Sequence, residues 1–178
     1  MNRELIEAAR LRGGADVDRL IEAAWPDAYR LARAVLGDAH AAADVAQESC
    51  VVLYRSIGSL RSADAFRVWM YRIVVREAGE YKRRGTQHLP DATRESYVED
   101  ATDALDVWRA LSALPHHLRE VIVLRYFEDL SSREIAAVLR IPDSSVRFRL
   151  MIARRRLRPM LGEAPEAASS FEGEAHAL

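Results

Sequence analysis

The sequence predicts an all-α protein with two small helical domains joined by a flexible acidic linker. Apolar residues recur at helical spacing along nearly the whole chain, and no alternating pattern typical of strands exceeds a few residues. Residues 85–103 interrupt this pattern, because they contain few large apolar side chains and several acidic ones. The chain has 178 residues, of which 49% are hydrophobic, so it can build one or two small cores.

Glycine and proline residues divide the first domain, residues 1–84, into five predicted helices. Gly13 and Gly14 end the first helix, Pro26 fits the first turn of the third, and Gly37 ends that helix. A short loop precedes the long last helix. The five predicted helices are residues 3–11, 15–24, 26–36, 39–57 and 63–84.

The second domain is predicted to span residues 104–161. Its first helix carries leucines and Trp108 at helical spacing, and Pro115 opens the next helix. Two shorter helices follow. Residues 162–178 are mostly small and include four acidic side chains, and we expect them to form a disordered acidic tail.

Residues 131–158 have the pattern of a helix-turn-helix. Ser131 and Glu134 form a capping box, in which the serine hydroxyl and the glutamate carboxylate each bind the other residue's backbone amide. Residues 140–143 form the turn, and Pro142 suits the start of a helix. The second helix then carries a stripe of buried apolar residues at Val146, Leu150, Ala153 and Leu157.

The formal net charge of −1 conceals a segregated pattern. Residues 66–84 carry six basic and two acidic side chains, and residues 140–158 carry seven basic and one acidic. Residues 85–107 and 159–178 are acidic instead. The net charge alone would argue against nucleic acid as a partner, whereas two compact basic segments argue for it.

The second helix of the helix-turn-helix has arginines on both sides of its outer surface. Such a helix fits the major groove of DNA, whose walls are rows of phosphates. An arginine-rich helix can also be an ordinary solvated surface, but the capping box, the turn and the apolar stripe together favour DNA contact. The candidate DNA-contact residues of this helix are Ser144, Ser145, Arg147, Phe148, Arg149, Met151 and Arg155.

Several classes of function are disfavoured by what the sequence lacks. Cys50 is the only cysteine, which excludes a disulfide framework and a cysteine-built zinc site. There is no glycine-rich phosphate loop, no metal-spaced histidine cluster and no nucleophile elbow, so we expect no enzyme, cofactor, metal or small-molecule substrate. No apolar run is long enough to span a membrane, and the first residues lack a signal-peptide pattern, so we expect a cytoplasmic protein without membrane insertion.

Four segments together resemble a sigma factor of the extracytoplasmic-function (ECF) group, which has only regions 2 and 4. Residues 114–136 resemble region 4, and the sequence Arg-Arg-Arg-Leu at 154–157 closes it as it does in the family. Residues 43–49 and 66–73 resemble two helices of region 2. The resemblance implies core RNA polymerase and promoter DNA as partners, with region 4 on the −35 element and region 2 melting the −10 element. It also suggests a stress response and, in many members, an anti-sigma factor.

The first of the two region 2 segments is the helix that docks on polymerase in the family. One face of this helix holds two carboxylates, an amide, an arginine and an exposed valine, opposite a face of core residues. A solvated face is the simpler reading of such charges, but the valine favours a partner surface. The candidate polymerase-binding residues are Asp44, Gln47, Glu48, Val51 and Arg55.

The second region 2 segment begins the helix that meets the −10 element. The family captures unstacked bases under the loop before this helix and holds the backbone on a basic track, which stacking and charge make possible. The resemblance assigns the loop Ser59, Leu60, Arg61, Ser62 and Asp64, and it assigns the backbone track Arg72, Arg76, Lys82, Arg83 and Arg84.

Four positions depart from the family pattern. Arg76 and Glu80 replace the common Asn and Asp, and Phe148 replaces a small polar residue, so we expect an unusual promoter sequence. Arg140 replaces the usual glycine of the turn; if this residue needs a positive φ, the arginine costs on the order of 1 kcal/mol.

A stand-alone helix-turn-helix transcriptional regulator is the alternative reading. Its first domain would then serve dimerisation or ligand binding, and the face that carries Asp44 and Glu48 would be ordinary solvated surface. Arginine substitution at these two residues distinguishes a sigma factor from a stand-alone regulator, because it should abolish transcription only in a sigma factor.

Overall fold

The computed structural model describes residues 2–85 and 102–161, and in these residues it contains eight α-helices, two 3-10 turns and no strand. This confirms the all-α prediction. The first group of helices is α1 (Arg3–Arg12), α2 (Ala15–Leu36), α3 (Ala39–Ser56) and α4 (Phe66–Gly85), with the turns η1 (Ile57–Ser59) and η2 (Ala63–Ala65) before α4. The second group is α5 (Thr102–Ala113), α6 (His116–Tyr126), α7 (Ser132–Leu139) and α8 (Asp143–Leu157).

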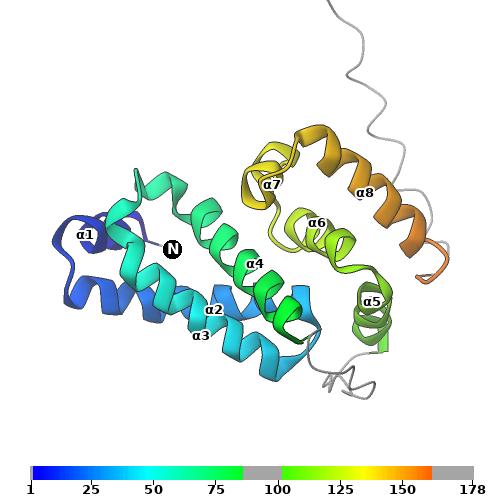
Figure 1. Ribbon diagram of the computed structural model, residues 1–178, viewed down its shortest axis with the longest axis horizontal. Coiled ribbons are helices and arrows are strands. Elements are labelled where there is room, and N and C mark those ends of the chain that lie inside the picture. The colour runs from blue at the N-terminus through cyan, green and yellow to red at the C-terminus, as the bar shows by residue number, and fades with distance from the viewer. Residues whose placement is uncertain (1, 86–101, 162–178) are drawn as a thin grey trace, which may run out of the picture.

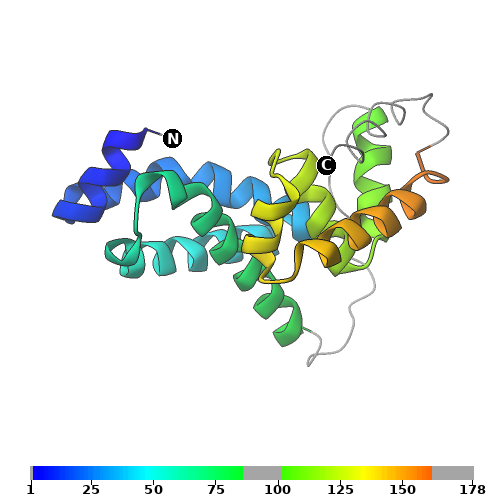
Figure 2. The ribbon, with the colours of Figure 1, turned by 90° about the horizontal axis from the view of Figure 1, so that it is seen from above.

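The two groups of helices lie side by side along the long axis of the molecule (Figures 1 and 2). In the first group α2, α3 and α4 pack together, and α1 lies across one end of this bundle (Figure 1). In the second group α8 packs on α6 and α7. Contacts of α4 with α7 and of α2 with α6 join the groups into a closed arrangement.

One continuous cluster of buried apolar residues runs through both groups of helices. In the first it includes the fully buried Leu31 and Met70, and in the second Leu124 and Ile135. Burial of apolar area of this kind supplies most of the free energy that holds helices together. The described helices include none that is long and apolar enough to cross a membrane.

Helix α2 corrects the prediction of two helices divided at Pro26, because it runs unbroken through that residue. Proline lacks an N–H and leaves the carbonyl of Glu22, four residues earlier, without its helical donor. Pro26 and Glu22 are both exposed, so water can bind this carbonyl, whereas Ala24 and Ala28 are fully buried in the core. Packing of both halves on the core therefore keeps the helix continuous.

The helix-turn-helix forms as predicted between α7 and α8. The Ser131 hydroxyl accepts from the Glu134 amide at 3.3 Å, and the Glu134 carboxylate accepts from the Ser131 amide at 2.8 Å, which completes the capping box. The hydrogen bond that the Ser131 hydroxyl donates to the Glu134 carboxylate at 2.7 Å, and then the bond from the Ser131 amide, lower the pKa of Glu134. Arg140 ends α7 in the left-handed conformation with φ 53°, so the expected strain of an arginine at this position is present.

The domain limits remain a prediction. The structure describes the segments 2–85 and 102–161, which correspond closely to the two predicted domains. The predicted linker, apart from its ends, and the whole predicted tail at 162–178 lie outside the described residues.

Candidate nucleic-acid interface

Helix α8 presents the predicted recognition surface to solvent. Its apolar stripe is buried as the spacing predicted, which fixes the rotation of the helix. On the opposite side the Phe148 and Met151 side chains are 61% and 54% exposed. Ser144, Arg147 and Arg155 are exposed as well, and Ser145 and Arg149 are half-buried.

One flank of α8 is held by polar contacts. Arg147 pairs with Asp143 at 2.6 Å, one turn earlier on the same helix. Arg154 donates a hydrogen bond to the Tyr126 hydroxyl at 2.8 Å, and its guanidinium lies 5.8 Å from the centre of that ring. These contacts orient the arginines of the outer surface without burying them.

The predicted loop before α4 has a buried anchor and an exposed rim. Ser59, Arg61 and Asp64 are exposed and Ser62 is half-buried, as residues that contact a ligand should be. Leu60 is only 4% exposed and packs in the core. Its side chain therefore anchors the loop and is not available at the surface.

The predicted basic track of α4 is divided by contacts within the protein. Arg72 donates to the backbone carbonyl oxygen of Ala137 in α7 at 3.1 Å, and Arg76 pairs with Glu77 at 2.7 Å. Lys82 is half-buried, and its pKa is lowered by burial and then by the nearby Arg119 charge. At the end of the helix Arg83 and Arg84 are exposed.

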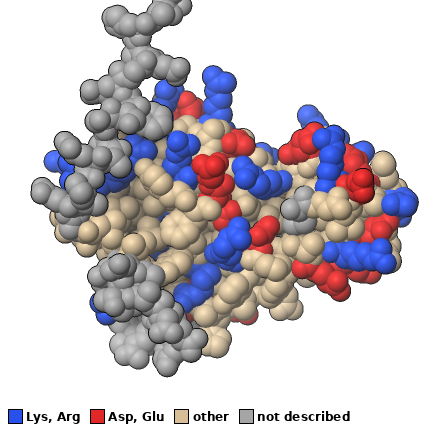
Figure 3. All heavy atoms as spheres, turned by 180° about the vertical axis from the view of Figure 1, so that it is seen from behind, with Lys and Arg blue, Asp and Glu red and all other residues tan. Residues whose placement is uncertain are grey.

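A groove of about 590 Å³ lies between α3 and α4 on one side and the helix-turn-helix on the other. Its walls contain Trp69 and four arginines, which the sequence predicts on separate surfaces or in the turn. The structure brings together Arg72, Arg76, Arg140 and Arg149 around this groove. On the face that Figure 3 shows, many basic and acidic side chains lie close to one another.

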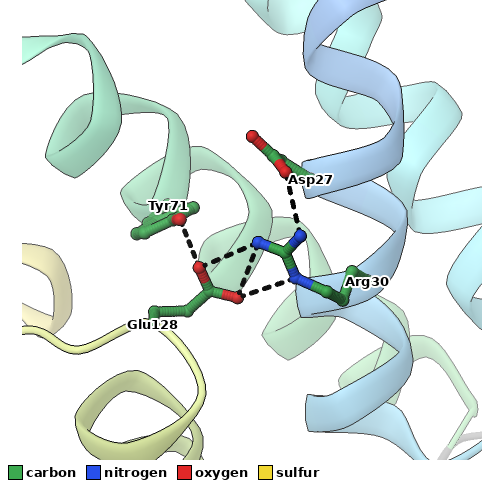
Figure 4. A network of polar contacts seen from close by, with 4 residues as sticks. All are labelled: Asp27, Arg30, Tyr71 and Glu128. Carbon is green, nitrogen blue, oxygen red and sulfur yellow. Dashed lines mark hydrogen bonds and ion pairs between the residues drawn. The ribbon is translucent and has the colours of Figure 1, made fainter. Parts of the chain in front are cut away.

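A buried carboxylate lies at the junction of the two groups of helices (Figure 4). The side chain of Glu128, between α6 and α7, is 2% exposed. It accepts a hydrogen bond from the Tyr71 hydroxyl of α4 and pairs with Arg30 of α2 at 3.3 Å. Arg30 also pairs with Asp27 at 3.1 Å. Burial, and then the bond to Glu128, raise the pKa of Tyr71 well above its ordinary value of 10.

A buried arginine makes the second polar contact of this junction. Arg119 of α6 is 6% exposed, and burial lowers its pKa. Its guanidinium donates to carbonyl oxygens at the ends of two helices, α2 in one group and α5 in the other, where the last turn lacks intrahelical donors. The acceptors are the carbonyls of Val35 (3.2 Å), Leu36 (3.3 Å), Leu111 (2.7 Å), Ser112 (2.6 Å) and Leu114 (3.2 Å).

Neither of these junction residues is predicted from the sequence. Glu128 and Arg119 stand within the segment whose resemblance was noted, but no local pattern points to partners more than 50 residues away. A glutamate between Phe127 and Asp129 at the end of a helix looks like part of an ordinary turn.

The predicted polymerase-binding face lies on α3, and the structure brings its residues together. Asp44, Gln47, Glu48 and Arg55 are exposed, and Val51 is 37% exposed among them. The opposite face is core, as the helical spacing predicted. It carries Ala42, Ala46, Cys50 and Leu53, all buried, and burial raises the pKa of the Cys50 thiol.

Comparison with known families and proteins gives two matched segments. Residues 20–88 match the model of sigma-70 region 2, and residues 104–157 match that of sigma-70 region 4. The chain is 32% identical to the RNA polymerase sigma-H factor of Pseudomonas aeruginosa over 71% of this chain and 78% of that protein. It is 31% identical to the ECF RNA polymerase sigma factor SigW of Bacillus subtilis over 75% of this chain and 82% of that protein.

Two solved structures share the fold. One is CnrH in complex with the cytosolic domain of CnrY, with a TM-score of 0.66, 25% identity, and coverage of 89% of this chain and 96% of that chain. The other is the sigma factor RpoE in complex with the anti-sigma factor NepR from Bartonella quintana, with a TM-score of 0.69 and 19% identity. It covers 83% of this chain and 98% of that chain.

Proposed function

This chain belongs to the ECF family of sigma factors, and we propose that it binds core RNA polymerase and directs it to promoters with two recognised elements. In this proposal the second domain binds the −35 element as duplex. The first domain docks on polymerase and melts the −10 element. Like sigma factors in general, the chain acts as an initiation factor, and the polymerase carries out the catalysis in the cytoplasm.

The observation that carries the proposal is the exposure of two large apolar side chains among arginines on the outer surface of α8. Phe148 and Met151 are large apolar side chains that a soluble helix would rarely expose together without a partner. In the major groove they can contact thymine methyl groups, while Arg147 and Arg155 reach phosphates and base edges. Promoter DNA is a partner that fits this combination.

The exposed face of α3 supports polymerase as the second partner. Asp44 and Glu48 lie one turn apart, and Val51 adds apolar area beside them. Burial of a small apolar centre inside a polar rim is the usual composition of a protein interface. The rest of the helix is fixed in the core, so this face is presented as a rigid surface.

The closed arrangement has to open before both promoter elements can be bound. Elements about two helical turns apart on DNA are separated by roughly 70 Å. In the closed arrangement α4 contacts α7 directly, through Arg72 and the Ala137 carbonyl at 3.1 Å. We therefore propose that the two domains separate on polymerase, with residues 85–103 as the connection.

A regulatory protein that stabilises the closed arrangement would hold the chain inactive. The solved structures similar to this chain include a sigma factor bound to an anti-sigma factor. The groove between the domains, with Trp69 and four arginines in its walls, offers an acidic segment of such a protein both charge and apolar contact. An anti-sigma factor and a role in stress response are accordingly part of the proposal.

The experiment that tests the proposal is transcription by bacterial core polymerase on pooled genomic fragments, with and without the chain. New RNA 5′ ends that share two upstream elements are expected. A double variant, Asp44→Arg with Glu48→Arg, should abolish these starts by placing positive charge on the polymerase-binding face. Asp18→Arg with Glu22→Arg is the matched control, because these acids are also exposed and four residues apart, on α2.

A different outcome would favour the stand-alone regulator. If no new starts appear although the chain binds duplex DNA, or if the α3 and α2 double variants behave alike, the polymerase-binding proposal is wrong.

A further inference from the structure

Helix α1 lies outside the segment matched by the region 2 model, which begins at residue 20. It packs against η1 and η2, the two turns of the loop before α4 (Figures 1 and 2). Ile6 and Ala9 of this helix are 4% and 1% exposed, so α1 is docked by core packing. No function is predicted for α1 from the sequence, although the helix lies beside this loop.

Glu7 of α1 caps the turn η2 from a distance of 56 residues. Its Oε1 accepts a hydrogen bond from the Ala63 amide at 3.2 Å, and Ala63 is the first residue of η2. The preceding residue, Ser62, makes no capping bond with its own side chain. The first amides of a helical turn lack intrahelical acceptors, so the Glu7 carboxylate replaces a local cap.

The second oxygen of this carboxylate is held by Arg10. Oε2 accepts from Arg10 Nε at 2.9 Å and pairs with Nη2 at 2.9 Å. Arg10 is one turn later on the same helix, so it fixes the carboxylate in the orientation that leaves Oε1 directed at Ala63. The bond from Arg10, and then the bond from Ala63, lower the pKa of Glu7.

A second contact from α1 reaches the next residue of the loop. Arg3 pairs with Asp64 at 2.8 Å, and both side chains are about 70% exposed. An exposed pair contributes little to stability. It does place a positive charge beside the carboxylate of Asp64, which would otherwise repel the phosphates of a bound strand.

We propose that α1 positions the loop for −10 recognition, with Glu7 as the positioning residue and Arg3 as a charge partner that makes Asp64 compatible with DNA. This inference rests on the proposed function, in which the loop holds unstacked promoter bases. A pocket for an unstacked base discriminates between bases only if its wall is fixed. Loss of the Glu7 cap therefore lowers discrimination at the −10 element and leaves discrimination at the −35 element unchanged.

The test compares the full-length chain with Glu7→Ala, Glu7→Gln and the control Glu4→Ala. Glu4 is exposed and lies nearly one turn earlier on the same helix. Glutamine keeps an oxygen that can accept from Ala63 but loses the charge that Arg10 holds. Urea unfolding of each variant first confirms that the chain is folded.

The first measurement is residue-resolved amide hydrogen exchange of the free chain. Protection of the Ala63 amide should fall about tenfold in Glu7→Ala, the change expected from loss of one charge-assisted hydrogen bond. Glu4→Ala should match the wild type and Glu7→Gln should lie between. Unchanged protection in Glu7→Ala would overturn the cap.

The second measurement is transcription with core polymerase from one promoter and from single-base variants of its −10 and −35 elements. Glu7→Ala should reduce the preference for the wild-type −10 sequence severalfold, with the −35 preference intact and partial recovery in Glu7→Gln. Equal loss at both elements, or no loss at either, would overturn the positioning role. A wild-type chain that initiates nothing defeats the proposed function instead, and the exchange measurement still tests the contact itself.

Discussion

The surfaces of α8 and α4, which the proposal assigns to the two promoter elements, differ in how much of each the rest of the protein occupies. On α8 the Phe148 and Met151 side chains are more than half exposed. On α4 the Arg72 side chain donates to a carbonyl of α7, and Arg76 lies in the groove between the domains. In the closed arrangement the second domain therefore restricts access to the surface proposed for melted DNA. The helix proposed to bind duplex DNA stays mostly open, apart from Arg149 in the wall of the groove.

The contacts that maintain this difference are of two kinds. Exposed ones, such as Arg72 with Ala137 and Arg67 with Glu134 at 3.9 Å, contribute little to stability. Buried ones, at Glu128 and Arg119, are costly to disrupt, because loss of one partner leaves polar groups without water or hydrogen bonds. The closed arrangement should therefore depend on a few buried side chains, and substitutions there can break it.

The largest effect is expected from Arg119→Ala. It leaves carbonyl groups at the ends of α2 and α5 without their donor, and the free energy of unfolding should fall by about 3 kcal/mol. Urea denaturation, monitored by circular dichroism, measures this free energy of unfolding. Arg133→Ala, an exposed arginine on α7, is the control and should change the free energy by less than about 0.5 kcal/mol. Equal effects of the two would show that the buried arginine has no special role.

A smaller effect is expected from Glu128→Ala, and it should change DNA binding at the α4 surface but not at the α8 surface. The Tyr71 hydroxyl then loses its acceptor and Arg30 its interdomain partner, so the domains should separate and the radius of gyration in X-ray scattering should increase. Affinity for a forked −10 DNA should rise about tenfold, while affinity for a −35 duplex stays constant. The control is Glu22→Ala, an exposed carboxylate on α2. A parallel change in both affinities would show that closure affects the α4 and α8 surfaces alike.

The smallest effect at neutral pH is expected from Tyr71→Phe, which removes the hydroxyl that binds Glu128. The titration of this hydroxyl also makes stability depend on pH in the alkaline range. Its pKa is raised in the closed protein above the ordinary value of 10, so the unfolded chain releases this proton first. The contribution of Tyr71 to stability is therefore complete below pH 10 and is lost as the pH rises above it. Unfolding measured between about pH 8 and 11 should show a steeper loss for the wild type than for Tyr71→Phe. That variant should cost about 1 kcal/mol at neutral pH through the lost hydrogen bond.

Local rules predicted much of this structure. The capping box at Ser131 and the buried stripe of α8 each depend on residues within a few positions of one another. The exposed candidate residues on α3 and α8 follow from the same helical spacing. Whether any of them contacts DNA or polymerase stays a prediction.

The remaining features depend on residues far apart in the chain. Glu128 is 57 residues from Tyr71, and Glu7 is 56 residues from Ala63, so neither contact leaves a periodic trace in the sequence. The burial of Leu60 depends on the placement of the whole loop, and the continuity of α2 through Pro26 depends on packing against the core. In each case tertiary placement overrides the local preference.

The groove between the domains also makes closure sensitive to ionic strength. Arg72 and Arg76 of α4 line it together with Arg140 and Arg149 of the helix-turn-helix, and Glu77 and Glu120 offset only part of this positive charge. Repulsion among the four cations opposes closure, and salt screens it over a distance of about 8 Å at physiological concentration. The ion pairs of Arg30 with Glu128 and of Arg67 with Glu134 favour closure and are screened by salt as well. A polyanion that bound in the groove would neutralise the repelling arginines and so favour the closed form at any ionic strength.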